Sequence, residues 1–243
     1  MEQKQENKVK IPSLDELAEA GVHLGHRSNK RAPEMEPYIS GLKSTIHIID
    51  LEKTAQKLEQ ALDFLLEKIS KGATVLFVGT KPAAKDTIKK YAEENNIPYI
   101  NQHWLGGTLT NFSSILRLIE NLNKMNQEKE QEKWEKYTKK ERLQMDREIE
   151  RLEKMVGGIK NLNKKPEVIY LIDLQKEKTA IKEAKRCKIP VIAMVDTNSN
   201  PNLVDWPIPA NDDAIKSIEL ITKKILEAVK IGQQNFVKNS VKE

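Results

Sequence analysis

A short segment near the N-terminus concentrates side chains that could bind a metal or an anion. Within residues 21–31 stand two histidines and three cations, with little apolar content: His23, His26, Arg27, Lys30 and Arg31. Two histidines without a third nearby ligand are a weak sign of a metal site, so we expect hydrogen bonds that orient the loop, with structural Mg²⁺ or Zn²⁺ as the alternative. The three cations are either solvated, which is the usual state of surface charges, or grouped as an anion site.

A second group of polar residues follows the predicted strands of a sheet. The tight segment Gly79-Thr80-Lys81 comes after one apolar run, and Asp173 and Asp196 come directly after two others. Open α/β folds usually bind ligands at the carboxyl ends of their strands, so Lys81 could hold a phosphate and the two acids could hold Mg²⁺. The spacing of a Walker loop and the glycine pattern of a dinucleotide site are both absent from the sequence. We therefore favour helix caps and loop hydrogen bonds for the acids.

Residues 104–111, Trp-Leu-Gly-Gly-Thr-Leu-Thr-Asn, separate short apolar runs from a long charged stretch. We name this segment the Gly-Gly turn, because paired glycines reach backbone angles that are closed to other residues. Asn111 is placed to cap the helix that the apolar spacing after it predicts. Trp104 could be a stacking surface for a base, but we favour a core anchor.

No convincing catalytic constellation accompanies these segments. No serine–histidine–acid set stands out, and the single cysteine, Cys187, lies in a predicted helix. It cannot form an internal disulfide, which fits a reducing compartment. The N-terminus shows no export signal, and no run approaches the roughly 20 apolar residues that span a bilayer. We therefore expect a cytosolic protein without a membrane partner.

The composition favours a polyanionic partner. The 243 residues include 41 Lys and Arg against 36 Asp and Glu, which gives a formal net charge of +5 and a sequence pI of about 9.0. Such a balance suits nucleic acid without proving it, because acids are nearly as numerous as bases. Charged residues make up 32% of the chain and aromatics 5%, so one segment must be polar nearly all round.

The scaffold for these residues follows from an alternation of apolar runs and helical spacing. Short apolar runs predict strands at 46–50, 74–78, 97–100, 168–172 and 191–195, with an extended piece at 206–209. Helical spacing predicts helices at 51–69, 82–94, 176–188 and 215–229, and a capping box at Ser13 and Glu16 predicts a short first helix. This repetition predicts an α/β fold with a parallel sheet and helices on both of its faces.

The middle of the chain predicts a pair of helices inserted into that fold. Its apolar residues form a narrow stripe that suits one partner helix, and Thr138 with Glu141 forms a capping box at the start of the second arm. Glycine pairs bracket the stretch. The predicted divisions are 1–111 for the first part of the α/β domain, 112–158 for the helical hairpin with its tip at 134–138, 159–232 for the second part, and 233–243 for a loose tail.

Several of these stretches together resemble the bacterial-type small-subunit ribosomal protein two, the S-two family. The matching stretches are 20–26 (Ala-Gly-Val-His-Leu-Gly-His), 48–54 (Ile-Ile-Asp-Leu-Glu-Lys-Thr), 75–81 (Val-Leu-Phe-Val-Gly-Thr-Lys), 101–111 (Asn-Gln-His-Trp-Leu-Gly-Gly-Thr-Leu-Thr-Asn), 195–198 (Val-Asp-Thr-Asn) and 208–214 (Ile-Pro-Ala-Asn-Asp-Asp-Ala). They occur in the order of the family and cover residues 14 to 232. So many matches in one order are specific to the family.

The resemblance implies a flavodoxin-like sheet interrupted by an antiparallel coiled-coil hairpin, and a structural, non-catalytic role in the ribosome. It implies binding to small-subunit ribosomal RNA between head and body, contacts with neighbouring small-subunit proteins, help in recruiting the S-one protein, no cofactor and no homo-oligomer. With the loop, the strand ends and the Gly-Gly turn, it predicts RNA contacts at Arg27, Lys30, Arg31, Lys43, Lys81, His103, Trp104, Thr108 and Asn111. Cations and turn amides would hold phosphates of folded RNA, whose A-form major groove hides the base edges.

The sequence departs from the family at two places. Residues 31–35 read Arg-Ala-Pro-Glu-Met where the family usually has Trp-Asn-Pro-Lys-Met, so Glu34 and Glu36 add negative charge where an aromatic and a cation are lost. His103 stands where the family often carries arginine. A neutral histidine would supply a hydrogen bond without a full charge, so we expect the cations of residues 27–31 to compensate.

Two other functions remain open from the residues alone. One is an enzyme or sensor that binds a phosphorylated ligand at the strand ends, with Gly79, Thr80, Lys81, Asp173 and Asp196 around it. The other is a scaffold that uses the helical hairpin to hold proteins without RNA.

Overall fold

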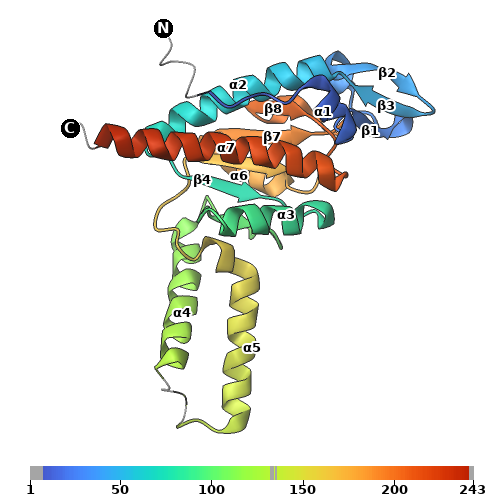
Figure 1. Cartoon of the computed structure of the whole chain (residues 1–243). Helices are drawn as coiled ribbons and strands as arrows, with labels where there is room; N and C mark the ends of the chain where they lie inside the picture. The colour runs from blue at the N-terminus through green and yellow to red at the C-terminus, as the bar shows by residue number, and fades with distance from the viewer. Residues whose placement is uncertain (1–7, 132–133, 135, 241–243) are drawn as a thin grey trace.

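The computed structural model describes residues 8–131, 134 and 136–240, which form a two-sheet body and a pair of helices extending from it (Figure 1). The central sheet is parallel, with the strand order β5–β4–β6–β7–β8. Its strands are β4 (Val75–Val78), β5 (Tyr99–Ile100), β6 (Val168–Ile172), β7 (Val191–Val195) and β8 (Trp206–Pro209). The sequence predicted all five, within two residues at each end.

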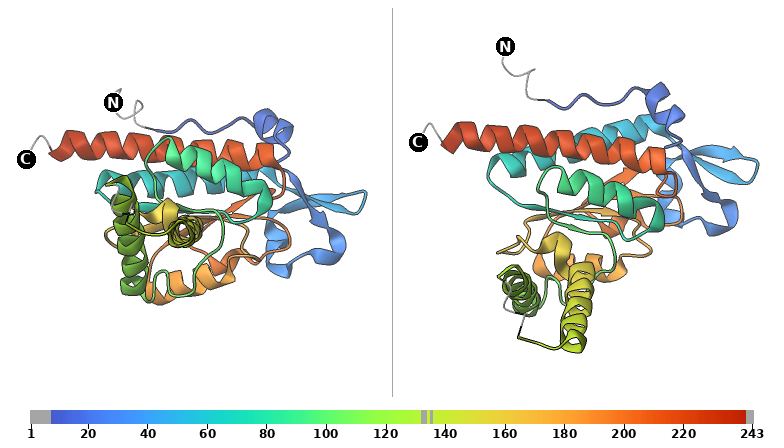
Figure 2. Two further views of the ribbon diagram at one scale, coloured as in Figure 1. Left: turned by 90° about the horizontal axis from the view of Figure 1, so that it is seen from below. Right: turned by 60° about the horizontal axis from the view of Figure 1, so that its bottom comes forward.

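Alternate residues of the central strands face two separate apolar layers. In β6, Tyr170 and Ile172 pack into one layer, and Ile169 and Leu171 pack into the other. The first layer contains α2 (Leu51–Ser70), α3 (Pro82–Glu93) and α7 (Ile215–Ser240), and the second contains α6 (Lys178–Cys187). Figure 2 shows these helices on opposite sides of the sheet. Strands covered on both faces need apolar side chains in both directions, which explains their continuous apolar runs.

A second sheet near the N-terminus is antiparallel, in the order β1–β3–β2. Its strands are β1 (Leu24–Arg27), β2 (Ile39–Lys43) and β3 (Ile46–Ile49), and Figure 1 shows them at one end of the body. Two predictions are corrected here. The segment predicted as a loop contains β1, and the strand predicted at 46–50 for the parallel sheet pairs with β1 and β2 instead. The short α1 (Leu14–Glu19), which precedes this sheet, begins at the predicted Ser13 capping box.

The turn between β2 and β3 explains why the sequence concealed this sheet. Ser44 and Thr45 both adopt positive φ angles, of 47° and 72°. A two-residue hairpin turn of this kind is normally signalled by asparagine or glycine, and neither occurs here. In addition, β2 is largely exposed, so it lacks the apolar run that marks a buried strand. The 3₁₀ turns η2 (Ser28–Lys30) and η3 (Pro33–Tyr38) join β1 to β2.

The two helices of the middle segment lie side by side and run in opposite directions (Figure 1). They are α4 (Phe112–Glu130) and α5 (Lys139–Val156). Ile115, Ile119 and Leu122 of α4 are buried in the same apolar cluster as Ile149 and Leu152 of α5. The narrow apolar stripe in the sequence is therefore the contact between the two helices.

The starts of these helices differ in how they are capped. Thr138 and Glu141 exchange the two hydrogen bonds of a capping box at the start of α5, as predicted. Asn111 occupies the cap position of α4, but its side chain makes no capping bond and accepts a hydrogen bond from the Ser113 hydroxyl at 3.2 Å. The predicted Asn111 cap is therefore corrected. The tip prediction falls partly on residues 132, 133 and 135, which lie outside the described residues.

The last helix is longer than its apolar spacing indicated. α7 continues to Ser240, whereas the sequence predicted a helix to 229 and a loose tail from 233. Gly232 explains part of the extension, because α7 packs so closely on α2 there that an added Cβ would lie 2.7 Å from the Cβ of Ile69. Among the described residues, no helix combines the length and apolarity that crossing a membrane requires.

Candidate nucleic-acid interface

The antiparallel sheet presents a group of exposed cations, which we call the cationic edge: Arg27, Lys30, Arg31 and Lys43. Arg27 ends β1 and Lys43 ends β2, and both pair with Ile46 of β3 from opposite sides. The strand register thus brings together two cations that are 16 positions apart in the sequence. Arg31 is partly neutralised, because its guanidinium lies 3.4 Å from the carboxylate of Glu36.

The sheet that carries the cationic edge is fixed to the loop after β7. The amide of His26 donates to the Thr197 hydroxyl at 2.8 Å, and the amide of Ala32 donates to the Thr197 carbonyl at 2.8 Å. Gly25 permits this approach, because a Cβ added there would lie 2.5 Å from the Thr197 methyl carbon. The glycine of the Val-His-Leu-Gly-His stretch is therefore required by packing.

His26 forms a second link between the two sheets. Its Nδ1 lies 3.1 Å from an oxygen of Asp196, and its Nε2 lies 3.3 Å from an oxygen of Asp213. The hydrogen bond to Asp196 raises the pKa of His26 above its usual value, and burial opposes that rise. The prediction that a histidine orients this loop is confirmed for His26. His23 differs, because its buried Nδ1 has no hydrogen-bond partner.

Lys81 lies at the carboxyl edge of the central sheet, where the sequence predicted a phosphate contact. Its ammonium is 2.5 Å from Asp212, 2.6 Å from Asp213 and 3.7 Å from Asp173, and its side chain is only 15% exposed. Burial alone would lower the pKa of Lys81, but these carboxylates raise it well above its usual value. The predicted role as a free phosphate ligand is therefore corrected, because the charge of Lys81 is used within the chain.

The strand-end acids also serve the chain itself. Asp173 accepts hydrogen bonds from the amides of Gln175 and Lys176 at 2.9 and 3.1 Å. Asp196 accepts from the amide of Thr197 at 2.5 Å, besides its contact with His26. The predicted loop hydrogen bonds of Asp173 are confirmed, since its side chain completes the turn that leads toward α6.

The Gly-Gly turn is organised by a residue that the sequence did not single out, Glu183 of α6. Its carboxylate, on a side chain 7% exposed, accepts five hydrogen bonds. The donors are the Trp104 indole at 3.2 Å, the amides of Gly107, Leu109 and Thr110 at 2.8, 2.9 and 3.1 Å, and the Thr110 hydroxyl at 3.1 Å. Burial would raise the pKa of Glu183, but the amide donors lower it below its usual value. A buried charge held this way makes the turn rigid.

The predicted contact residues in the turn divide into inner and outer groups. Trp104 is 4% exposed and Thr108 is 3% exposed, and the Thr108 hydroxyl donates to the Leu105 carbonyl at 2.6 Å. The core interpretation of Trp104 is confirmed, and its assignment as a surface contact is corrected. His103, which directly precedes the turn, and Asn111, its last residue, are exposed. Gly107 has the positive φ, of 92°, that the glycine pair predicted.

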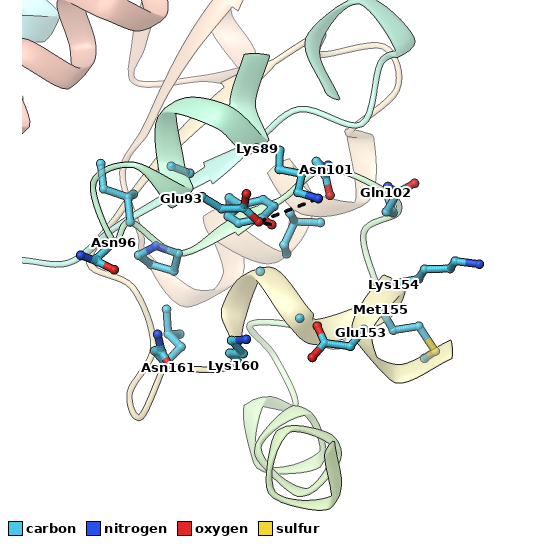
Figure 3. Close-up of a pocket in the computed structure, with 18 of the residues that line it drawn as sticks. Lys89, Glu93, Asn96, Asn101, Gln102, Glu153, Lys154, Met155, Lys160 and Asn161 are labelled. Atoms are coloured by element: carbon cyan, nitrogen blue, oxygen red, sulfur yellow. Dashed lines mark hydrogen bonds and ion pairs between the residues drawn. The ribbon is translucent and has the colours of Figure 1, made fainter. Parts of the chain in front are cut away.

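A cavity of about 820 Å³ lies between the edge of the body and the base of the helix pair (Figure 3). Figure 3 shows Lys89 and Glu93 of α3 on one wall and Glu153 and Lys154 of α5 on the other. The 3₁₀ turn η4 (Gly157–Ile159) follows α5 along this wall. Lysines and glutamates both line this cavity. It therefore lacks the uniformly positive potential that would attract a polyanion.

Comparison with known proteins decides the family. The sequence profile described as "Ribosomal protein S2" matches residues 17–232. The chain belongs to the ribosomal protein S2 family. It is 44% identical to "Small ribosomal subunit protein uS2" of Wolinella succinogenes over 221 residues, which is 91% of this chain and 82% of that protein. It is 46% identical to the protein of the same name from Dictyoglomus thermophilum over 220 residues, which is 90% and 89% of the two chains.

S2 is a structural ribosomal family, so the prediction that this chain is not an enzyme is confirmed. The strand ends of this S2 chain agree with that conclusion. Lys81 is held by three aspartates, the Thr80 hydroxyl donates to buried Glu177, and a Cβ at Gly79 would lie 2.8 Å from Ile88. The side chains of Thr80 and Lys81, which the alternative phosphate site would use, therefore have partners within the chain.

Glu34 and Glu36, the two acids that the sequence analysis noted as unusual for the family, have partners within this S2 chain. Glu34 accepts a hydrogen bond from the Asn200 side chain at 2.8 Å, and Glu36 faces Arg31. Glu34 thereby ties η3 to the loop that follows β7, which includes η5 (Pro201–Leu203).

Proposed function

We propose that this chain is a structural component of the small ribosomal subunit and binds small-subunit ribosomal RNA through its cationic edge. Membership of the S2 family supports the ribosomal role. The observation that carries the RNA site is the pairing of Arg27 and Lys43 with Ile46, because it places two exposed cations at one end of a sheet. Exposed cations contribute most of the affinity for a phosphate backbone, and they do so without reading base sequence.

The other predicted residues contribute in two ways. His103, just before the Gly-Gly turn, and Asn111, at its end, are exposed and can donate hydrogen bonds to RNA phosphates or 2′-hydroxyls. Lys81, Trp104 and Thr108 contribute indirectly, because their polar groups make contacts within the chain that hold the loops carrying the exposed residues. In this proposal, only some of the nine residues for which the sequence predicted RNA contacts touch the RNA themselves.

The finer arrangement belongs to the same proposal. The chain lies between the head and body of the subunit as a single copy in the cytoplasm, contacts neighbouring small-subunit proteins and helps to recruit the S-one protein. Residues 112–158 form an inserted antiparallel coiled coil between parts of the α/β domain at 1–111 and 159–232. The shared buried cluster of α4 and α5 and their extension from the body support this assignment.

The salt dependence of RNA binding tests the cationic edge. Each phosphate contact contributes about 0.7–0.9 to the slope of log affinity against log salt. Arg27→Ala/Lys30→Ala/Lys43→Ala should therefore lower the slope by about two, measured by filter binding to small-subunit RNA between low and moderate salt. These three side chains are exposed, so the variant should keep the circular dichroism spectrum of the wild type.

A matched control removes the same charge elsewhere. Lys223→Ala/Lys230→Ala/Lys238→Ala removes three exposed cations from α7, whose C-terminal end lies away from the antiparallel sheet (Figure 1). We expect its slope to differ from that of the wild type by less than about half the contribution of one phosphate contact. Equal slopes for the two variants would remove the cationic edge from the RNA footprint, and so would full occupancy of both variants in purified small subunits.

A further inference from the structure

The outward face of α6 carries positive charge alone. Its exposed charged residues, together with the cation at the end of the helix, form what we call the α6 face: Lys178, Lys182, Lys185, Arg186 and Lys188. The two acids of this segment are buried. Glu177 and Glu183 are 2% and 7% exposed, and their carboxylates accept hydrogen bonds from the Thr80 hydroxyl and from the Gly-Gly turn. Residues 177–188 therefore expose cations without exposing an acid.

The other long helices place acids close to their exposed cations. Ion pairs between residues three or four positions apart occur in or beside α2, α3, α4, α5 and α7, as between Lys89 and Glu93. Within the part of the chain that the structure describes, no cation of the α6 face forms an ion pair. Lys182 instead has a like charge four positions away on each side, at Lys178 and Arg186. Like charges at this spacing destabilise a helix, so the helix alone does not favour this face.

The helix dipole accounts for only part of this arrangement. Lys185 and Arg186 lie in the last turn of α6, where the partial negative charge of the helix end favours cations. Lys178 is the first residue of the helix, where the partial charge is positive and an acid is favoured. The first turn contains no acid. Cations that run from the first turn to the last therefore fit an external polyanion better than they fit the helix itself.

The Gly-Gly turn packs against the same helix. Glu183 accepts hydrogen bonds from the amides of Gly107 and Leu109 at 2.8 and 2.9 Å, which fixes the turn to α6. Burial raises the pKa of Glu177, and the charge of His103 is among those that oppose this rise, so His103 lies near the start of α6. The exposed donors on either end of the turn are thus held beside the α6 face.

We propose that the α6 face is a second surface for the phosphate backbone of small-subunit RNA, separate from the cationic edge. The inference rests on the proposed function, because it names a further contact with the same RNA. Exposed cations without competing acids on one side of a helix match the charge of a phosphate backbone. A protein partner fits less well, because protein interfaces have an apolar core and α6 exposes no large apolar side chain.

The two cationic surfaces lie on different parts of the body. α6 covers the central sheet on the side opposite α2 and α7, whereas the cationic edge belongs to the antiparallel sheet at one end of the body (Figures 1 and 2). The phosphate contacts of the two surfaces should therefore add. With both in use, the chain holds more of the RNA than the cationic edge alone can reach.

The salt dependence of binding to small-subunit RNA tests the α6 face in the full chain. Lys178→Gln/Lys182→Gln/Lys185→Gln removes three charges and keeps residues that favour a helix. At about 0.7–0.9 per phosphate contact, the slope of log affinity against log salt should fall by about two. Arginine at the same three positions keeps the charge and should restore the slope of the wild type. The positions are exposed, so both variants should fold, which circular dichroism would check.

The α7 variant that lacks Lys223, Lys230 and Lys238 is the matched control, because it loses the same charge elsewhere. Combining the glutamine variant of α6 with the three substitutions at the cationic edge should lower the slope by about four, since the contacts add. A glutamine variant with the slope of the α7 control would overturn the inference, as would a combined loss no larger than that of the cationic edge alone.

The remaining outcomes separate this inference from the proposed function. A lower slope for the cationic edge with none for α6 would leave the proposed function standing without the α6 face. Wild-type chain that shows no salt-dependent binding to small-subunit RNA would overturn both. An unchanged RNA slope, with loss of a neighbouring protein from reconstituted small subunits, would assign the α6 face to a protein partner and overturn the inference.

Discussion

Replacing Glu183 by glutamine should remove hydrogen bonds that hold the Gly-Gly turn, while changing the size of the side chain very little. Of the five hydrogen bonds to this carboxylate, Oε1 accepts two and Oε2 accepts three. Glutamine retains only one oxygen, so at least two donors face an amide NH₂ instead of an acceptor. A buried donor left without its acceptor costs about 1–3 kcal/mol, so Glu183→Gln should lower the free energy of unfolding by about 2–6 kcal/mol.

Urea unfolding followed by circular dichroism measures this loss. With a slope of about 3 kcal/mol per M, the midpoint should fall by roughly 0.7 M or more. Hydrogen exchange should quicken at the amides of Gly107, Leu109 and Thr110, which donate to Glu183. Glu120→Gln, at an exposed position of α4, is the matched control and should change stability by less than about 0.5 kcal/mol.

The effect of Glu183→Gln should also depend on pH. The pKa of Glu183 in the folded chain is below its reference value of 4.5, because the amide donors outweigh burial. The stabilisation is therefore fully present above pH 4.5 and is lost as the pH falls through the lower pKa of the folded state. The difference between wild type and variant should be constant above pH 4.5 and shrink below it. A variant as stable as the wild type at neutral pH, with unchanged amide exchange, would refute this account of the turn.

Three further substitutions test the contact between the two sheets, the cap of α5 and the packing of α4 on α5. Gly25→Ala should destabilise the chain by about 1–3 kcal/mol, because its Cβ would meet Thr197 at the junction of the two sheets; an unchanged thermal midpoint would contradict this packing. Thr138→Ala removes the capping box of α5 and should cost about 1 kcal/mol in urea unfolding, whereas a Ser replacement should cost little. Leu152→Ala should cost about 2–5 kcal/mol because this side chain is fully buried against α4, and a loss below 1 kcal/mol would mean that the helices separate readily.

The parallel sheet could be predicted because its strands have a clear signal in the sequence. Val75–Val78 and Val191–Val195 are buried on both faces, so each is a continuous apolar run between loops. The antiparallel sheet could not be predicted in the same way. Its strands are short and half exposed, and its hairpin turn uses Ser44 and Thr45 in a conformation that those residue types do not signal.

The residue types of the candidate site could be predicted from the sequence, but their arrangement in space could not. The cations of residues 27–31 stood out by type, whereas their closeness to Lys43 depends on a strand register that the sequence conceals. Glu183 gave no signal, because one acid in an amphipathic helix resembles any solvated charge. Its partners lie 73 to 79 positions away, so only the folded chain shows its role. The aspartates that hold Lys81 lie farther still from it in the sequence, at 92 to 132 positions, so they were hidden in the same way.

The contact of the His26 amide with Thr197 spans 171 positions of the chain, and this sets an order of events during synthesis. At about 5–20 residues per second, a ribosome needs roughly ten to thirty seconds to make the chain between these two residues. The N-terminal hairpin leaves the exit tunnel first, yet its anchoring loop is among the last segments to appear. A chain released early would therefore carry its positive side chains on an undocked hairpin, and only a nearly complete polypeptide would display them in their final positions.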